Sequence, residues 1–243
     1  MSDVALHRLG GEGPDLLLIH GFGADRLSWL AVAPQLCDLA TVWAVEYAGH
    51  GAAGDDLGAG DPLTIASAIG TAIDGKLTRP HIVGHSLGGT LALHLAAMMP
   101  DDLSGLLLLA PASLAGGIDT GFVRAIPELD DPGAALDLLR RLVSRKVLVT
   151  PRMAEAMVAG LAAQNRRTSL RQIAQALESA EPPPFPPELP FEILWGAEDA
   201  ITAPPQETTP MLRVIDGVGH MPHIEAASEV VSAVRRALSQ DMT

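Results

Sequence analysis

The sequence contains a single cysteine, Cys37. One thiol cannot form an internal disulfide or a thiolate metal cluster, so the composition predicts a reducing compartment and a cytoplasmic location. Aromatic residues are also scarce, at only 3% of the chain. The hydrophobic core must therefore be aliphatic, formed mainly by leucine, alanine, valine, isoleucine and methionine side chains.

Cations are few as well, since 16 Lys and Arg face 29 Asp and Glu, which gives a formal net charge of −13. This balance excludes general nucleic-acid binding and docking on an anionic membrane, because both depend on cations facing phosphate groups. Apolar runs such as residues 106–112 are far shorter than the roughly 20 residues that span a bilayer. Residues 1–15 carry no apolar core of an export signal.

Short apolar runs alternate with helical patterns over the first two thirds of the chain. Runs that are apolar on both faces favour strands of a parallel sheet covered by helices. The alternation predicts an α/β fold with an open sheet. The predicted strands are 16–20, 41–46, 81–85 and 105–110, and the predicted helices are 28–36, 63–76 and 87–99.

The alternation stops at about residue 116, and only helical patterns follow, near 134–147, 151–163 and 170–179. Thr150 followed by Pro151 is typical of a helix N-cap with proline at the first helical position. The proline-rich segment 181–188 closes this region as a stiff connector. Strands are expected again at 191–195 and 213–215, followed by a last helix at 226–238. We therefore predict a single domain with a core of residues 1–115 and 185–243 and a helical lid at about 116–184.

The motif with the clearest chemistry is Gly84-His85-Ser86-Leu87-Gly88, which follows a predicted strand and opens a predicted helix. In this context G-x-S-x-G forms a strained turn that exposes the serine hydroxyl as a nucleophile. The turn also aims backbone N–H groups at a nearby oxyanion. We therefore predict that Ser86 is the nucleophile and that the N–H group of Leu87 stabilises the oxyanion.

A serine nucleophile needs a base, and the base needs an acid that orients it. Asp199 follows the predicted strand 191–195, and His220 follows the next one. We predict Asp199 as the orienting acid and His220 as the base. Glu198 competes for the acid role but is expected to be a solvated loop carboxylate, and Glu225 is expected to hold the loop after His220.

The segment His20-Gly21-Phe22-Gly23 directly follows the first predicted apolar strand. A glycine-flanked loop there presents a second oxyanion donor, which we assign to the N–H group of Phe22. Gly21, His85 and Trp29 are predicted to line the substrate site. His220 and His223 lie three residues apart, but no H-E-x-x-H pattern accompanies them, so we predict neither a metal nor a cofactor.

Together these motifs resemble the α/β-hydrolase superfamily over nearly the whole chain. Residues 193–199 and 219–225 resemble in particular the hydrolase module of acetoin dehydrogenase acyltransferase components and small carboxylesterases. The resemblance implies a mostly parallel sheet flanked by helices with a helical lid. The sequence departs from the family pattern at Glu46-Tyr47-Ala48-Gly49-His50-Gly51, where Asp-x-Pro-Gly-x-Gly is common. This departure implies altered loop rigidity near the site.

We therefore expect a serine hydrolase of the carboxylesterase type that cleaves small esters or related acyl bonds. One alternative is an acyltransferase that uses the same three residues. Another is a non-enzymatic partner module of a complex like acetoin dehydrogenase.

Charge is distributed unevenly along the chain. Residues 140–171 hold eight cations and one acid, Glu155, whereas the rest of the chain holds eight cations and 28 acids. These cations are expected either to form the solvated faces of the lid helices or to attract an anionic substrate or an acidic partner surface.

Overall fold

The computed structural model describes residues 2–114, 119–163, 165–185, 189–207 and 209–240. Within them one seven-stranded sheet has the order β1-β3-β2-β4-β5-β6-β7. β1 pairs antiparallel with β3, and every other pair of neighbours is parallel. The strands are β1 (Val4–Gly10), β2 (Asp15–Ile19), β3 (Thr41–Tyr47), β4 (His81–His85), β5 (Gly105–Leu109), β6 (Phe191–Gly196) and β7 (Leu212–Ile215).

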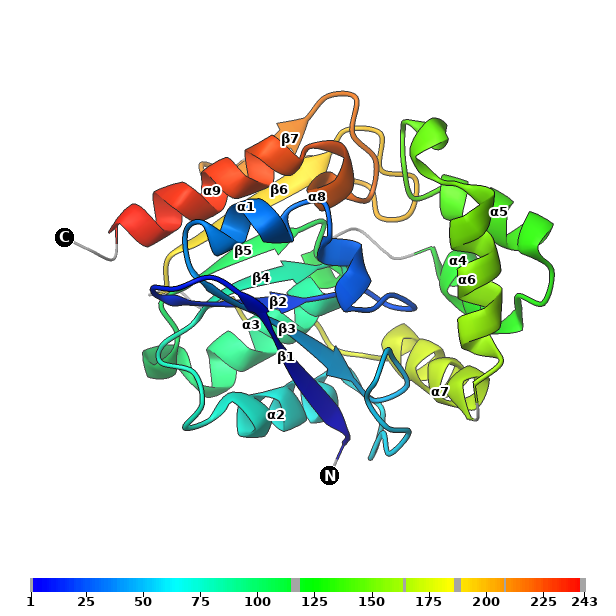
Figure 1. Ribbon diagram of the computed structural model, residues 1–243, viewed down its shortest axis with the longest axis horizontal. Helices are drawn as coiled ribbons and strands as arrows, with labels where there is room; N and C mark the ends of the chain where they lie inside the picture. The colour runs from blue at the N-terminus through cyan, green and yellow to red at the C-terminus, as the bar shows by residue number, and fades with distance from the viewer. Residues whose placement is uncertain (1, 115–118, 164, 186–188, 208, 241–243) are drawn as a thin grey trace.

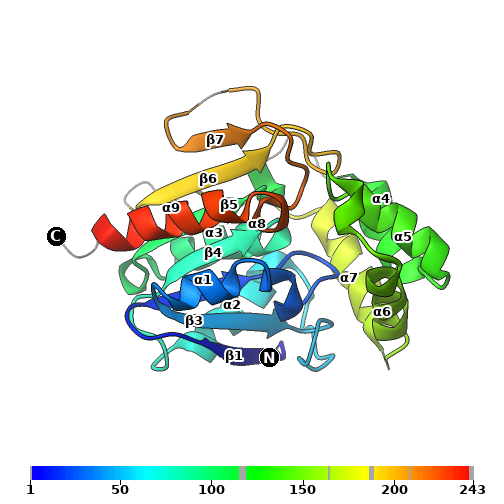
Figure 2. The same cartoon turned by 45° about the horizontal axis from the view of Figure 1, so that its top comes forward.

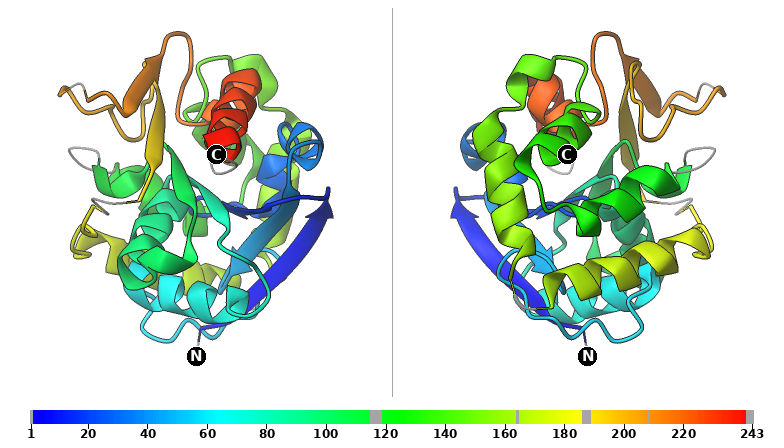
Figure 3. Two further views of the ribbon diagram at one scale, coloured as in Figure 1. Left: turned by 90° about the vertical axis from the view of Figure 1, so that its left-hand side faces the viewer. Right: turned by 90° about the vertical axis from the view of Figure 1, so that its right-hand side faces the viewer.

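Helices cover both faces of this sheet (Figures 1 and 3). Side chains alternate along a strand, so Leu17 and Ile19 pack on one face while Leu16 and Leu18 pack on the other. The first face is covered by α2 (Pro62–Ile73) and α3 (Leu87–Met98), and the second by α1 (Ala33–Cys37) and α9 (Ala227–Gln240). The predicted mostly parallel sheet flanked by helices is confirmed, and burial on both faces explains the continuous apolar runs.

Between β5 and β6 the described residues form helices and no strand, which confirms the predicted helical insertion. It comprises α4 (Thr120–Ala125), α5 (Pro132–Arg140), α6 (Pro151–Leu161) and α7 (Arg166–Glu178). These helices share an apolar cluster of their own and lie at the carboxyl ends of the parallel strands (Figure 2). Thr150 caps α6 as predicted, accepting a hydrogen bond from the N–H of Met153. The predicted start of the insertion at 116, and residues 186–188 of the connector, lie outside the described residues.

Three local predictions differ from the structure. β1 was not expected, because it is a partly exposed edge strand that lacks the apolar signature of the central strands. The predicted helix 28–36 is divided into a 3-10 turn, η1 (Arg26–Trp29), and α1, since Pro34 is accommodated only in a first helical turn. The predicted helix 134–147 ends as α5 at Arg140 and is followed by an irregular segment. Among the described residues, no helix is long and apolar enough to cross a membrane.

Glu46, at the end of β3, joins three parts of the core. Its buried carboxylate accepts hydrogen bonds from the Nε2 of His7 (3.0 Å), the N–H of Ala52 (2.7 Å) and the guanidinium of Arg26 (2.9 Å). Burial by itself raises the pKa of Glu46, but the hydrogen bonds from Ala52 and Arg26 outweigh it and lower this pKa from its ordinary value of 4.5. The residue that replaces the family's aspartate is thus an ionised link between β1, β3 and the loop after β2.

Replacing Glu46 with glutamine is expected to lower the free energy of unfolding by about 1–3 kcal/mol at neutral pH, because one carboxylate oxygen that accepts N–H groups becomes a donor. A carboxyl whose pKa is lowered in the folded state stabilises it above the unfolded-state pKa and loses this effect as the pH falls. The difference between wild type and Glu46→Gln should therefore shrink on acidification from about pH 6 to below pH 4. Urea unfolding across this range, with the exposed Glu12→Gln as control, measures it; a difference that stays constant contradicts the assignment.

Candidate active site

Ser86 lies at the turn from β4 into α3, where the backbone is strained. Its φ and ψ angles are +53° and −116°, a conformation that non-glycine residues rarely adopt. The flanking glycines are needed because the chain is crowded: a Cβ on Gly84 would lie 2.4 Å from the carbonyl oxygen of Gly88, and one on Gly88 would lie 2.1 Å from that of Ile19. The turn thus places the Ser86 hydroxyl at the start of α3, as the motif predicts.

The strand register brings the other predicted residues to the same edge of the sheet. Ile19 pairs with Gly84, and Gly196 pairs with Ile215. Because these strands are parallel, the loops after β2, β4, β6 and β7 all leave at their carboxyl ends, where open α/β sheets place their sites. These loops carry the predicted oxyanion segment, Ser86, Asp199 and His220, respectively.

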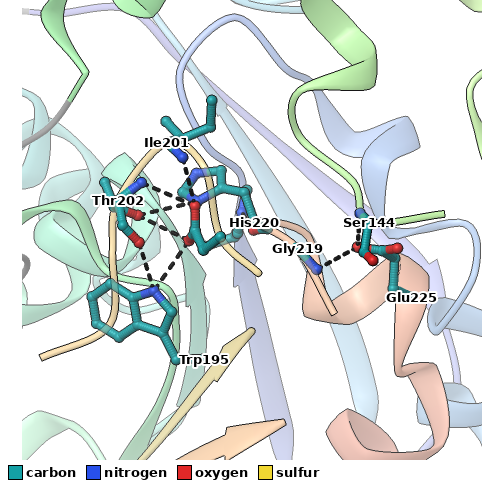
Figure 4. Close-up of polar contacts among 9 residues, drawn as sticks. Ser144, Trp195, Ile201, Thr202, Gly219, His220 and Glu225 are labelled. Carbon is teal, nitrogen blue, oxygen red and sulfur yellow. Dashed lines mark hydrogen bonds and ion pairs between the residues drawn. The ribbon is translucent and has the colours of Figure 1, made fainter. Parts of the chain in front are cut away.

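Asp199 and His220 form a buried pair. Figure 4 shows His220 beside Ile201, Thr202 and Trp195, which surround this pair. The Nδ1 of His220 lies 2.7 Å from the Oδ2 of Asp199, and both side chains are almost fully buried. The other oxygen, Oδ1, accepts the N–H groups of Ile201 (2.8 Å) and Thr202 (2.9 Å), while the Nε1 of Trp195 donates to Oδ2 (3.1 Å). The carboxylate is therefore held on several sides and faces the imidazole in a fixed direction.

The electrostatics of Asp199 favour its charged form. Burial raises the pKa of this carboxyl, but the hydrogen bond from His220, the charge interaction with that residue and the hydrogen bonds from Thr202 and Ile201 outweigh burial, so the pKa lies below its ordinary value of 3.8. Asp199 is thus an acceptor near neutral pH, and the Nδ1 of His220 carries the proton between them. This tautomer leaves the Nε2 of His220 as the basic nitrogen.

The backbone of His220 is held from two directions. Its N–H donates to the carbonyl of Leu142 (2.8 Å), in the irregular segment after α5, and its carbonyl accepts the Nε2–H of His85 (2.8 Å). The rings of His85 and His220 lie 4.9 Å apart, so the elbow and the histidine loop are in contact. Among the described residues, no hydrogen bond joins the Ser86 hydroxyl to His220; in enzymes without substrate such contacts are often long and tighten on binding.

The loop after β2 lies directly beside the elbow. A Cβ on Gly21 would be 3.2 Å from the Cβ of Ser86. The N–H of Gly23 donates to the Nε2 of His50 (3.0 Å), and the Nδ1 of His20 donates to the carbonyl of Gly21 (2.8 Å). Over the residues that the structure describes, the N–H groups of Phe22 and Leu87 have no backbone or side-chain acceptor, as a pair of oxyanion donors requires.

The contact between His50 and the loop after β2 was not indicated by the sequence. Burial lowers its pKa well below the ordinary value of 6.5, so its imidazole is neutral and accepts the N–H of Gly23 on Nε2. Its Nδ1 donates to the carbonyl of Ala48 (3.1 Å), which fixes the tautomer. The sequence showed only that His50 is flanked by Gly49 and Gly51, where the chain departs from the family pattern. It did not indicate which group the His50 ring contacts.

Known proteins share this architecture with the chain. A family model described as alpha/beta hydrolase family matches residues 16–234. The chain belongs to the alpha/beta hydrolase family. The chain is also 30% identical, over 236 residues, to the dihydrolipoyllysine-residue acetyltransferase component of the acetoin cleaving system of Pseudomonas putida. That match covers 91% of this chain and 63% of the relative, so the hydrolase spans less than two thirds of the relative's length.

Solved structures agree on the fold of this α/β hydrolase. A thermophilic esterase from Thermogutta terrifontis superposes with a TM-score of 0.77 at 25% identity, covering 100% of this chain and 95% of the esterase. A meta-cleavage product hydrolase, CumD, gives a TM-score of 0.83 at 19% identity, covering 98% and 94%. The predicted α/β-hydrolase fold is thereby confirmed.

Two residues predicted to line the substrate site, Trp29 and His85, are buried in the hydrolase. Trp29 is fully buried and packs its ring 4.6 Å from that of His223, among the aliphatic side chains of α1 and α9. His85 is also buried and donates to the backbone of His220. That Trp29 and His85 line the substrate site stays a prediction, and Gly21 lies beside Ser86.

The structure also distinguishes the two neighbouring acids of the loop after β6. Glu198 is exposed to solvent, whereas Asp199 is buried against His220. Glu225 does hold the loop around His220, as expected, since its carboxylate accepts the N–H of Gly219 (2.6 Å).

Most cations of the segment 140–171 bind groups of the hydrolase itself. Arg141 pairs with Asp119, and Arg171 pairs with Glu128 at 2.5 Å. Others donate to backbone carbonyls, as Arg166 does to Gly51 (2.5 Å). Arg145, Lys146 and Arg167 bind the protein in similar ways. These contacts attach the insertion to itself and to the core, and attraction of an anionic substrate or partner stays a prediction.

Proposed function

We propose that this α/β hydrolase is a serine esterase that cleaves carboxylic esters or related acyl bonds through an acyl-enzyme. The observation that carries the proposal is the meeting, at one sheet edge, of a strained serine at a helix start and a buried His–Asp pair. A serine that only capped the helix would not require a buried His–Asp pair beside it. A buried ion pair that only stabilised the fold would not require a strained serine beside it.

In the proposed reaction the Oγ of Ser86 attacks the acyl carbon while the Nε2 of His220 takes its proton. His220 then delivers this proton to the leaving alcohol, and Asp199 stabilises the imidazolium that forms in between. The N–H groups of Phe22 and Leu87 bind the oxyanion. Water activated by His220 attacks the acyl-enzyme, and the acid leaves with Ser86 restored.

The substrate proposed is a small ester with an apolar acyl group. The insertion covers the oxyanion loop with apolar side chains: a Cβ on Gly23 would lie 3.0 Å from the Cγ2 of Ile126 and 4.0 Å from the Cε of Met157. Both side chains belong to the apolar cluster of the insertion or pack against it. The esterase among the similar solved structures supports this substrate class.

A fluorophosphonate probe tests the proposal directly. The wild-type protein should be labelled at Ser86 with a mass gain of one phosphonyl group, and it should hydrolyse p-nitrophenyl esters, with the shorter acyl chains favoured. Intact-mass and peptide spectrometry measure the label, and absorbance measures the ester series. If neither labelling nor hydrolysis occurs at any concentration, the chain is a non-enzymatic partner module instead.

Acyl transfer is a second candidate, which the name of the Pseudomonas putida relative favours. The same residues would form the acyl-enzyme, and an alcohol or thiol would replace water as the acceptor. Adding such acceptors at rising concentration distinguishes the two. Hydrolase chemistry predicts free acid as the main product, whereas an acyltransferase predicts that the transferred product dominates at low acceptor concentration.

A further inference from the structure

The insertion touches the histidine loop through a small set of backbone contacts. The segment 142–145 lies between α5 and the 3-10 turn η5 (Lys146–Leu148). The carbonyl of Leu142 accepts the N–H of His220 (2.8 Å). The loop also passes very close to this segment, since a Cβ on Gly219 would lie 2.8 Å from the nitrogen of Ser144. Two segments more than 70 residues apart in sequence thus form one seam next to His220.

Glu225 lies at the centre of this seam (Figure 4). Its Oε2 accepts the N–H groups of Gly219 (2.6 Å) and Ser144 (3.1 Å), and its Oε1 accepts the N–H of Arg145 (2.8 Å). The Nε of Arg145 lies 3.8 Å from Oε1. The Glu225 side chain is fully buried, so its oxygens depend on these donors for hydrogen bonds. One carboxylate therefore connects the residue before His220 to two consecutive residues of the insertion.

We propose that Glu225 is a positioning residue of the esterase. By holding Gly219 against the backbone of residues 144–145, it sets the direction of the peptide that carries His220. The imidazole then meets both Asp199 and Ser86 only when the insertion is seated on the core. This inference rests on the proposed function. It assigns to the insertion a part in catalysis besides covering the substrate.

Replacing Glu225 with glutamine tests the carboxylate. Both oxygens accept N–H groups, so the amide NH₂ of glutamine must face at least one N–H donor, whichever way it turns. The seam should open slightly and His220 should shift, and a displacement of about 1 Å next to the chemistry costs up to about 100-fold. We expect kcat to fall about 10- to 100-fold with KM nearly unchanged. Glu225→Ala should lower kcat further, so that glutamine at this position partly rescues kcat relative to alanine.

A matched pair at Arg145 tests the seam without changing Glu225. Arg145→Ala keeps the backbone N–H but removes a half-exposed guanidinium that lies 3.8 Å from the Oε1 of Glu225 and donates to the carbonyl of Glu225 (2.5 Å). Because such exposed side-chain contacts contribute little, we expect this variant to retain kcat within about threefold. Arg145→Pro removes that N–H, and the φ of −85° at this position is close to what proline adopts. We expect Arg145→Pro to lower kcat about tenfold relative to Arg145→Ala, again with KM unchanged.

Kinetics with p-nitrophenyl esters at 10 °C, with circular dichroism to establish folding, give the readout. Glu229→Gln, which breaks an exposed ion pair with Arg213, is the control for a glutamate-to-glutamine change. A purely structural role would lower the melting temperature and leave kcat of the folded variants unchanged. The inference would be overturned by an unchanged kcat in the folded variants or by a rise in KM alone. It would also be overturned if both Glu225→Gln and Arg145→Pro failed to fold. Absence of hydrolysis and labelling in the wild type would instead overturn the proposed function.

Discussion

Replacing Ser86 with alanine is expected to lower kcat for ester hydrolysis by about 10⁵- to 10⁶-fold, because members of such a catalytic unit cannot substitute for one another. The oxygen that attacks the acyl carbon is lost, and no acyl-enzyme can form. Water attack assisted by the oxyanion donors and by His220 would remain, so the residual rate should still exceed that in solution. Steady-state hydrolysis with a sensitive ester, together with loss of fluorophosphonate labelling, measures the effect.

The fold should survive this change. Among the described hydrogen bonds, none involves the Ser86 hydroxyl, so its removal should alter the free energy of unfolding by less than about 1 kcal/mol. Alanine keeps the Cβ and hence the same backbone strain at a φ of +53°. Ser104→Ala is the matched control, since Ser104 precedes β5 at the opposite end of the sheet. Hydrolysis by folded Ser86→Ala at more than a hundredth of the wild-type rate would contradict the mechanism.

The sequence predicted the central strands, the insertion and the pair of Asp199 and His220 because each leaves a local pattern. Strands buried on both faces are apolar throughout, and G-x-S-x-G makes its turn from its own glycines. The parallel sheet, whose loops leave at one edge, then brings the serine, the acid and the histidine together. These features depend on neighbours in sequence or on a fixed topology.

The contacts that surround the pair could not be predicted in the same way. Leu142 binds His220 through a backbone carbonyl, which every residue type offers, and His50 accepts the N–H of Gly23 across 27 residues. Trp29, which was predicted to line the substrate site, packs its ring beside His223, and nothing in the sequence indicated that contact. These contacts depend on how loops pack in three dimensions, and no periodicity in the sequence predicts them.

Replacing Asp199 with asparagine is expected to lower kcat about 10⁴-fold while leaving Ser86 and the oxyanion donors in place. Asparagine can keep its oxygen toward the N–H groups of Ile201 and Thr202, which Oδ1 accepts at 2.8 and 2.9 Å. Its NH₂ group then faces the Nδ1 of His220 and donates to it. The proton of the imidazole moves to Nε2, and the nitrogen that should accept the proton of Ser86 is blocked.

The neighbouring acid provides the control for this argument. Glu198→Gln changes an exposed carboxylate one residue away and should keep kcat within about twofold, since surface changes far from charged partners have small effects. Equal loss in both variants would mean that the local negative charge matters and the 2.7 Å contact to His220 does not. Because Asp199 is ionised and holds several donors, Asp199→Asn also loses stability, so both variants are compared at 10 °C, where circular dichroism shows them folded. A slow folded Asp199→Asn beside an active Glu198→Gln would identify the buried carboxylate as the group that orients His220.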